Sequence, residues 1–269
     1  MRITIARERG WLERQSLRRW SLLWLVLLAL WLLVWIVTPL AGWTWGEDTF
    51  PLLASLGVLA QAAVSVVALA QAWPVSRLVR AAVVVLLLTW AVEAIGAATG
   101  VPFGSYGYTD ALQPQLLGVP LLIPVAWLMM LPPAWAVGAT LQPAVVGWRG
   151  RLRLAALSGA AFTAWDLYLD PQMVAHGLWR WEEPGGYFGI PWVNLLGWWA
   201  TATALTWLVN PRDLPRRPLL IVYTLVWLFQ AVGLGILWGQ PGPALAGLLG
   251  MGVWAVAAWR REWRVWRGQ

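Results

Sequence analysis

The chain has 269 residues, of which 60% are hydrophobic and only 12% are charged, and its mean hydropathy is +0.63. About a quarter of the residues in an average soluble domain are charged, so this composition predicts a polytopic membrane protein. The net charge of +7 does not require a nucleic-acid partner, because basic loops are normal at a membrane surface. With no cysteine, one histidine and no lysine, the chain cannot build a thiolate site, a histidine-cluster iron centre, a retinal Schiff base or a phosphate-binding loop that ends in Gly-Lys.

Apolar segments close to 20 residues recur along the whole chain, and this length is what a helix needs to cross a bilayer. The expected fold class is therefore all-α, a single transmembrane helix bundle over residues 1–269 with about eight spans. The first segment has no small-residue cleavage site, so we expect a retained helix and not a signal peptide. The expected spans are residues 20–38, 51–72, 78–98, 120–141, 154–169, 191–209, 218–238 and 242–259.

Eight spans place the basic residues almost entirely on one side. Of the 19 arginines, 18 fall in the N-terminal segment 1–19, in alternate loops, or in the C-terminal tail 260–269, and only Arg180 falls opposite. The positive-inside rule then predicts that both termini are cytoplasmic, in a bacterial cytoplasmic membrane.

Three acidic residues fall within or at the end of the expected spans. Glu93 lies near the outer end of segment 78–98, while Asp166 and Asp170 are one helical turn apart in the last turn of segment 154–169. We expect Pro171 to end that helix, since proline disfavours helical geometry in the residue before it. Carboxylates in a bilayer cost at least a few kcal/mol each, so they mark a function unless they only hydrogen-bond between helices or cap an exposed end.

Small and polar residues surround these acids at helical spacing. Because small residues let helices approach closely, we expect three such faces to converge on one pocket at the outer side of the membrane. The faces are Gly159, Thr163, Asp166 and Asp170; Glu93, Gly96, Ala97 and Gly100; and Asn194, Gly197 and Thr201.

Two outer loops, residues 100–110 and 177–194, are rich in glycine, proline and aromatic residues. Most of the 25 tryptophans are expected to form an interfacial aromatic belt. Six aromatic residues flank the acids and are candidates for substrate binding instead, whereas His176 is expected at the surface. The six are Tyr106, Tyr108, Trp165, Trp179, Trp181 and Tyr187.

Three long motifs give the chain a family resemblance. They are EAIGAATGVPFGSYGY at 93–108, AWDLYLDPQM at 164–173 and GYFGIPWVNLLGW at 186–198. In these motifs the chain resembles the integral-membrane carotenoid hydratases, of the bisanhydrobacterioruberin hydratase and γ-carotene C-1′,2′-hydratase type. The resemblance implies addition of water to the terminal C-1′,2′ double bond of an acyclic carotenoid, giving a tertiary alcohol, with no redox cofactor or metal. It does not assign the catalytic residues.

Hydration of a trisubstituted alkene needs a proton donor, a site that tolerates a tertiary cation, and a base for the attacking water. A carboxylic acid can stay neutral in an apolar site, and aromatic faces can stabilise the cation. We predict Asp166 as the acid, with Glu93 as the second candidate, and Asp170 as the residue that positions or deprotonates water. Asn194 and Tyr108 are candidate hydrogen-bonding partners.

Other functions fit part of this pattern. A carotenoid cyclase starts with the same protonation but lets an internal double bond capture the cation, and a proton-coupled transporter also uses buried acids. Against a transporter, no inverted repeat is visible and the acids lie toward one side. An intramembrane prenyltransferase would need a second Asp-rich motif, which is not found in the sequence. Its diphosphate substrate is cytoplasmic, whereas the acids are predicted at the opposite face. Hydratase ranks first, cyclase second and transporter third.

Overall fold

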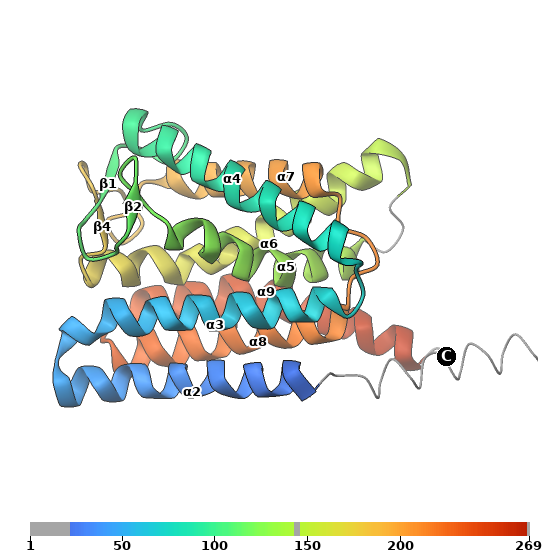
Figure 1. Cartoon of the computed structure of the whole chain (residues 1–269), viewed down its shortest axis with the longest axis horizontal. Coiled ribbons are helices and arrows are strands. Elements are labelled where there is room, and N and C mark those ends of the chain that lie inside the picture. The colour runs from blue at the N-terminus through green and yellow to red at the C-terminus, as the bar shows by residue number, and fades with distance from the viewer. Residues whose placement is uncertain (1–21, 143–145, 268–269) are drawn as a thin grey trace, which may run out of the picture.

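The computed structural model of the chain describes residues 22–142 and 146–267. Over these residues eight α-helices run roughly along the long axis of the molecule, as Figure 1 shows. The predicted all-α bundle of about eight helices is confirmed. The helices are α2 (Leu22–Trp45), α3 (Phe50–Ala70), α4 (Val75–Thr99), α5 (Leu122–Leu141), α6 (Gly147–Ala175), α7 (Trp192–Val209), α8 (Arg216–Val232) and α9 (Pro241–Arg267).

Within the described part of the chain, six helical segments are long and apolar enough to cross a membrane: α2, α3, α4, α5, α8 and α9. The helix α6 is less apolar because it contains arginines in its first turns and two aspartates further on, and α7 contains Asn194 and several small residues. Both pack within the bundle beside the apolar helices. The chain is a multi-pass membrane protein.

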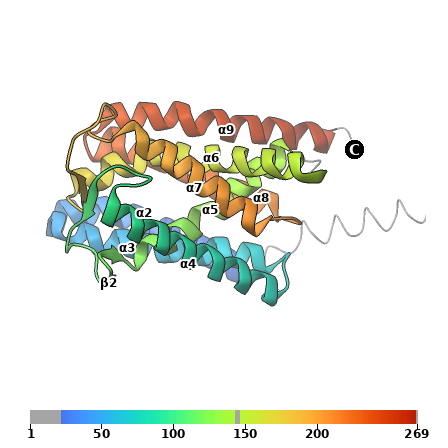
Figure 2. The ribbon, with the colours of Figure 1, turned by 90° about the horizontal axis from the view of Figure 1, so that it is seen from above.

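The helix α5 forms the centre of the bundle. It contacts α3, α4, α6 and α8, and its residues from Trp127 to Thr140 are all buried. In Figures 1 and 2, α4 and α7 lie on one side of α5 and α6, and α2, α3 and α8 lie on the other. Most helices therefore contribute to one cluster of buried hydrophobic residues.

The contact between α6 and α7 depends on a glycine. A Cβ atom on Gly159 would lie 2.9 Å from the backbone oxygen of Trp199 and 3.1 Å from the backbone nitrogen of Thr203. Because backbone atoms cannot move aside as a side chain does, this close approach requires glycine. The predicted role of the small-residue face on this helix, to bring its neighbour close, is confirmed for Gly159.

The prediction that Pro171 ends its helix is wrong. The helix α6 continues through Pro171 to Ala175, so Asp166 and Asp170 are not in its last turn. The helix also begins earlier than the expected span, at Gly147. Its first turns contain arginines, so a search for apolar segments does not include them. One of these, Arg151, donates a hydrogen bond of 2.9 Å to the backbone oxygen of Trp207 and lies over its ring.

The basic C-terminal segment is also helical. It was expected as a tail after residue 259, but α9 continues to Arg267, with Arg264 and Arg267 in its last turn. Arginine is a good helix former, and its charge interacts favourably with the C-terminal end of a helix. The predicted basic N-terminus, residues 1–19, lies outside the described residues.

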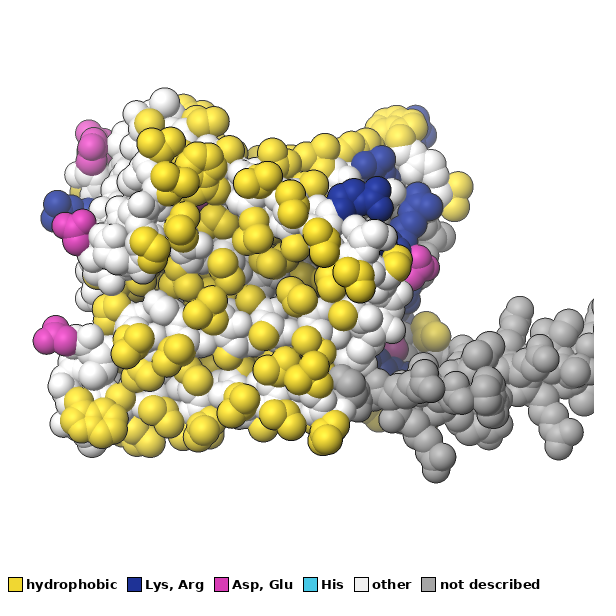
Figure 3. All heavy atoms as spheres, viewed as in Figure 1, with side chains coloured by type: hydrophobic (Ala, Val, Ile, Leu, Met, Phe, Trp, Pro, Cys, Tyr) yellow, Lys and Arg dark blue, Asp and Glu magenta, His cyan; other side chains and the backbone are white. Residues whose placement is uncertain are grey.

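The two ends of the bundle carry opposite charges. Figure 3 shows most basic side chains gathered at one end, with a few acidic ones among them, and mainly acidic side chains at the other. The described arginines lie at the starts of α4, α6 and α8, in the connection before α8, and in the last turns of α9, all at the first end, and Arg180 is the described exception. The exposed acids Glu47, Asp48, Asp110, Glu182 and Glu183 lie in the connections at the second end, which we call the acidic end.

Short β-ribbons at the acidic end are not predicted from hydropathy. Strand β1 (Tyr106–Tyr108) pairs antiparallel with β4 (Trp179–Trp181), so that Tyr106 lies opposite Trp181 and Tyr108 opposite Trp179. A second ribbon joins β2 (Gln115–Leu116) to β3 (Val119–Pro120). The first ribbon ties together the two aromatic loops, which are far apart in the sequence. Two single turns complete the fold: a 3-10 turn at Glu47–Thr49 and a π-helical turn at Gly233–Leu237.

Replacing Gly159 by alanine should destabilise the bundle by about 1 to 3 kcal/mol, the usual cost of overpacking. The matched control is Gly57→Ala in α3, where the nearest atom to an added Cβ is a side-chain carbon at 3.7 Å. That variant should be neutral or slightly stabilising, because alanine is the better helix former. Thermal unfolding in detergent measures both, and equal effects would contradict the assigned contact.

The charge asymmetry makes a prediction about topology. Since the chain has no cysteine, each introduced cysteine is a unique label. With the basic end in the cytoplasm, a membrane-impermeant maleimide should label Glu183→Cys in intact cells and Arg264→Cys only after permeabilisation. The reverse pattern would show that the acidic end faces the cytoplasm.

Candidate active site

Four polar side chains that are distant in sequence meet inside the acidic end of the bundle. They are Glu93 from α4, Asp166 and Asp170 from α6, and Asn194 from the first turn of α7, and each is at most 2% exposed. The predicted convergence of three polar faces is thus present for these residues.

The two aspartates share one amide. The Asn194 Nδ2 donates one hydrogen bond of 3.0 Å to Oδ2 of Asp166 and a second, shorter one to Oδ2 of Asp170. The other oxygen of Asp170 accepts a hydrogen bond of 3.1 Å from the Trp179 indole, whereas Oδ1 of Asp166 is buried without a partner among the described residues. Two carboxyl groups that accept from the same amide nitrogen lie close enough to behave as a coupled pair, which can hold one proton between them.

Glu93 is surrounded by hydrogen-bond donors. Its Oε2 accepts from the hydroxyl of Tyr106 at 2.5 Å and of Tyr108 at 2.8 Å, and its Oε1 accepts from the Trp127 indole at 3.1 Å. Burial, followed by the negative charge of Glu93, raises the pKa of both tyrosine hydroxyls above their ordinary value. Both hydroxyls therefore keep their protons at neutral pH and remain donors.

The β1–β4 ribbon supplies donors to both sides of the site. In a strand, alternate residues face the same side, so the sequences Tyr-Gly-Tyr and Trp-Arg-Trp present four aromatic rings on one face. Tyr106 and Tyr108 reach Glu93, Trp179 reaches Asp170, and Trp181 donates to the backbone oxygen of Phe103 at 3.1 Å. The ribbon thus links the two groups of acids.

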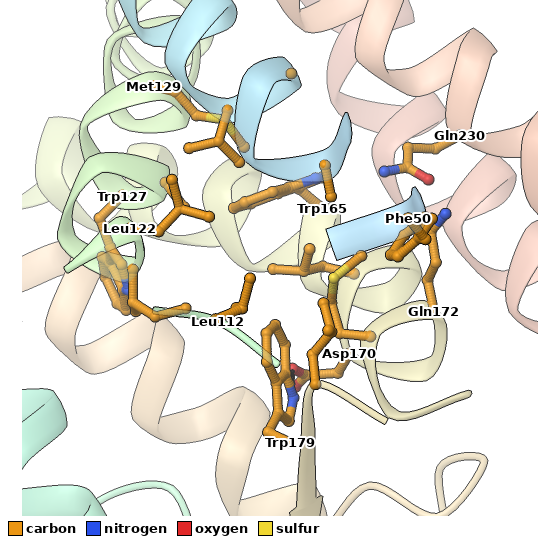
Figure 4. Close-up of a pocket in the computed structure, with 18 of the residues that line it drawn as sticks. Phe50, Leu112, Leu122, Trp127, Met129, Trp165, Asp170, Gln172, Trp179 and Gln230 are labelled. Atoms are coloured by element: carbon orange, nitrogen blue, oxygen red, sulfur yellow. Dashed lines mark hydrogen bonds between the residues drawn. The ribbon is translucent and has the colours of Figure 1, made fainter. Parts of the chain in front are cut away.

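A cavity lies between the acids and the apolar helices. Its empty space is about 1120 Å³, counting the part that is open at the surface, and residues of seven helices (α2 to α8) and both aromatic loops line it. Figure 4 shows Asp170 and Trp179 beside one another, with Trp127 on one side of the cavity and Gln172 and Gln230 on the other. Among the described residues the lining contains no arginine or histidine. An anionic ligand would find no counter-charge there, and most of the lining is apolar or aromatic, so the cavity suits a large apolar molecule.

Most of the predicted site residues line this cavity. Besides Glu93 and Asp170, the lining includes six of the predicted binding residues: Tyr106, Tyr108, Trp165, Trp179, Trp181 and Asn194. Two predicted residues do not line it. Asp166 shares the Asn194 amide with Asp170 but is not part of the lining, and Tyr187 packs against Phe188 and Trp192.

Tyr187 has a structural contact that follows from Pro171. Proline has no N–H group, so the backbone oxygen of Leu167, four residues earlier, lacks its usual helical donor. The hydroxyl of Tyr187 donates to this oxygen at 2.6 Å. The helix can therefore continue past the proline, and the segment with both aspartates stays helical.

Several site residues escaped the sequence analysis. Trp127, which binds Glu93, lies in the uniformly apolar α5, where no pattern distinguishes it from a lipid-facing residue. Gln172 and Gln230 also line the cavity. A polar residue within or beside an apolar segment is a signal in the sequence that could have identified them. His176, expected at the surface, has only 10% of its side chain exposed and stacks on Phe50, with 3.6 Å between the ring centroids.

Comparison with known proteins places these observations in context. A family model described as "Carotenoid biosynthesis protein" matches residues 52–261. Bisanhydrobacterioruberin hydratase from Haloarcula japonica is 35% identical over 121 residues, which make up 44% of this chain and 40% of that protein. The match thus spans about two fifths of the relative. No solved structure gives a significant match.

The contact between Tyr187 and Leu167 can be tested by a double-mutant cycle. Tyr187→Phe should destabilise the protein by about 1 to 3 kcal/mol, because a buried carbonyl loses its partner. In a Pro171→Ala background the restored N–H group can bind the same oxygen, so Tyr187→Phe should cost much less. Thermal unfolding of the four proteins gives the coupling, and an equal cost in both backgrounds would show that the hydroxyl acts elsewhere.

Proposed function

The chain belongs to the carotenoid biosynthesis protein family, and we propose that it adds water to the terminal C-1′,2′ double bond of an acyclic carotenoid end group. The product is a tertiary alcohol. The observation that carries this proposal is a group of buried carboxyls beside a cavity lined mainly by apolar and aromatic side chains. Glu93 and Asp170 line this cavity, and Asp166 is linked to Asp170 through Asn194. The hydratase relative supports the same reaction class.

The first step is transfer of a proton to the alkene. A carboxylic acid O–H of Asp170, which lines the cavity, gives its proton to C-2′, and the π electrons form the new C–H bond. The cation is then tertiary, at C-1′. Asp166, the acid expected from the sequence, does not line the cavity, so we assign it the supply of the proton through its coupling with Asp170.

The second step is capture of the cation by water. Aromatic faces of Tyr108, Trp165 and Trp179 surround the reacting end and stabilise positive charge without forming a bond to it. Water attacks C-1′ through its oxygen, and a carboxylate takes the released proton. We assign this base to Glu93, which three donors hold in place. Two of them are tyrosines of β1, whereas Asp170 binds Trp179 of β4. Return of this proton from Glu93 to the aspartate pair restores the starting state, so the net change is one molecule of water added to the carotenoid.

The proposed location is a bacterial cytoplasmic membrane, with both termini in the cytoplasm and the site toward the outer face. A polyene reaches such a site from the bilayer, and water reaches it from the acidic end. The cyclase remains the second candidate because the aromatic lining would stabilise the same cation.

Expression in a host that accumulates lycopene or γ-carotene tests the reaction. Chromatography and mass spectrometry should show a pigment heavier by one water. Asp170→Asn and Glu93→Gln should each lower its formation by about 10²-fold or more, since a general acid or base contributes 10² to 10⁴ to a rate. Asp110→Asn, an exposed carboxylate at the same end, is the matched control and should retain activity.

Other outcomes separate the rival functions. A new pigment of unchanged mass would identify a cyclase. Unchanged pigments, with folded protein and substrate present in the same membrane, would reject both reactions and favour a transporter. Full activity of Asp170→Asn would remove Asp170 as the proton donor.

A further inference from the structure

The cavity contains two further buried polar atoms, on the side chains of Trp165 and Gln230. Trp165 is 1% exposed and Gln230 is 6% exposed, and both line the cavity. The Trp165 Nε1 and the Gln230 Oε1 are buried, and neither has a hydrogen-bond partner among the described residues. Figure 4 shows the indole nitrogen of Trp165 directed toward the side of the cavity where Gln230 lies. Neither atom takes part in the mechanism above.

The chemistry of these two atoms restricts what can bind between them. An indole N–H can only donate a hydrogen bond, and an amide oxygen can only accept one. An anion or a ketone would satisfy the indole alone, and a cation would satisfy the amide oxygen alone. A neutral O–H group satisfies both, because its oxygen accepts and its hydrogen donates. A buried polar atom without a partner loses the hydrogen bond that it would make in water, so a ligand that satisfies both atoms gains binding energy from them.

Further polar groups lead from the cavity to the acidic end. Gln172 lines the cavity two residues after Asp170, and its backbone oxygen accepts a contact of 2.8 Å from Nδ1 of His176. The other ring nitrogen of His176 is 3.5 Å from a carboxylate oxygen of the exposed Glu47. These contacts link the cavity-lining residue Gln172, through His176, to the exposed Glu47.

We propose that Trp165 and Gln230 form a subsite for a neutral O–H group beside the reacting end of the carotenoid. The inference rests on the proposed function for the source of that group. Two sources share this chemistry: the water consumed in the hydration, and a hydroxyl already present on the carotenoid. Occupancy by water would also explain how an apolar cavity holds its second substrate close to the cation.

Gln230→Leu tests the subsite because it keeps the size of the side chain and removes its polar atoms. Trp165→Phe is the second variant, and it removes only the indole N–H from an aromatic residue. The matched control is Gln71→Leu, the same change at an exposed position at the basic end. Each purified protein in detergent is titrated with lycopene and with an acyclic carotenoid that carries one tertiary hydroxyl, and turnover of both is measured.

The two sources give different results. If the subsite holds water, Gln230→Leu lowers the kcat for both carotenoids by about 5- to 100-fold and leaves their affinities unchanged. If it holds a hydroxyl of the carotenoid, the affinity for the hydroxylated compound falls by a similar factor and lycopene is unaffected. Unchanged affinity and kcat for both compounds, in folded Gln230→Leu and Trp165→Phe proteins, would overturn the proposal.

A direct structural readout keeps this inference separate from the proposed function. An experimental structure of the protein without carotenoid should show an ordered water between Trp165 Nε1 and Gln230, and this water should be absent in Gln230→Leu. Ordered water in a protein that hydrates no carotenoid would reject the reaction and keep the subsite. Direct pairing of the two side chains, with no space for an oxygen, would reject the subsite even in an active hydratase.

Discussion

Burial of three carboxyl groups in an apolar bundle is the constraint on which the acidic end of this protein depends. A carboxyl removed from water costs several kcal/mol unless it finds hydrogen-bond donors. The helices around Glu93 and Asp170 offer two such donors, Trp127 and Asn194, and the rest come from the loops. The loops therefore fold back over the helix ends, since only there do their tyrosine and tryptophan donors meet the acids. The need of the carboxyls for hydrogen-bond donors therefore explains why aromatic residues of the loops both line the cavity and bind the acids.

The same need for partners governs the backbone. Prolines within α5 and α6 remove N–H groups and leave carbonyl oxygens free in the helix interior. In α6 the Tyr187 hydroxyl binds the oxygen of Leu167, and in α5 the buried Ser65 hydroxyl donates at 2.7 Å to the oxygen of Met129, four residues before Pro133. In each case a side chain from another element takes the place of the missing donor. Two helices with internal prolines can thus form the centre of the bundle without exposing polar backbone to an apolar core.

Hydropathy and the positions of the arginines were sufficient to predict the number of helices and the two charged ends, because both follow from the bilayer and not from details of packing. Helical spacing also brought Glu93, the two aspartates and Asn194 to one pocket. The limits appear where a tertiary partner decides the outcome. Pro171 would end an isolated helix, and only a tyrosine 16 residues later in the chain makes its continuation possible.

The roles of individual residues were harder to predict than their positions. Asp166 and Asp170 occupy the same helix face, and spacing alone cannot show that Asp170 lines the cavity while Asp166 does not. Trp127 is one of many tryptophans in apolar segments, and its hydrogen bond to Glu93 depends on how α4 crosses α5. Such choices are made by packing between helices, which no short-range pattern encodes.

The β1–β4 ribbon makes its own alignment a condition for assembling the site. In the observed register the aromatic residues of both strands face the acids, and Gly107 and Arg180 form the pair between them that faces away. A slip of one residue would reverse every side chain of a strand, so that a glycine or an arginine would replace the donors of that strand and its carboxyl would keep only the donor on a helix. A misaligned ribbon therefore leaves a buried carboxyl short of hydrogen bonds. The acids that we assign to the reaction therefore also favour the correct register of the loops that cover them.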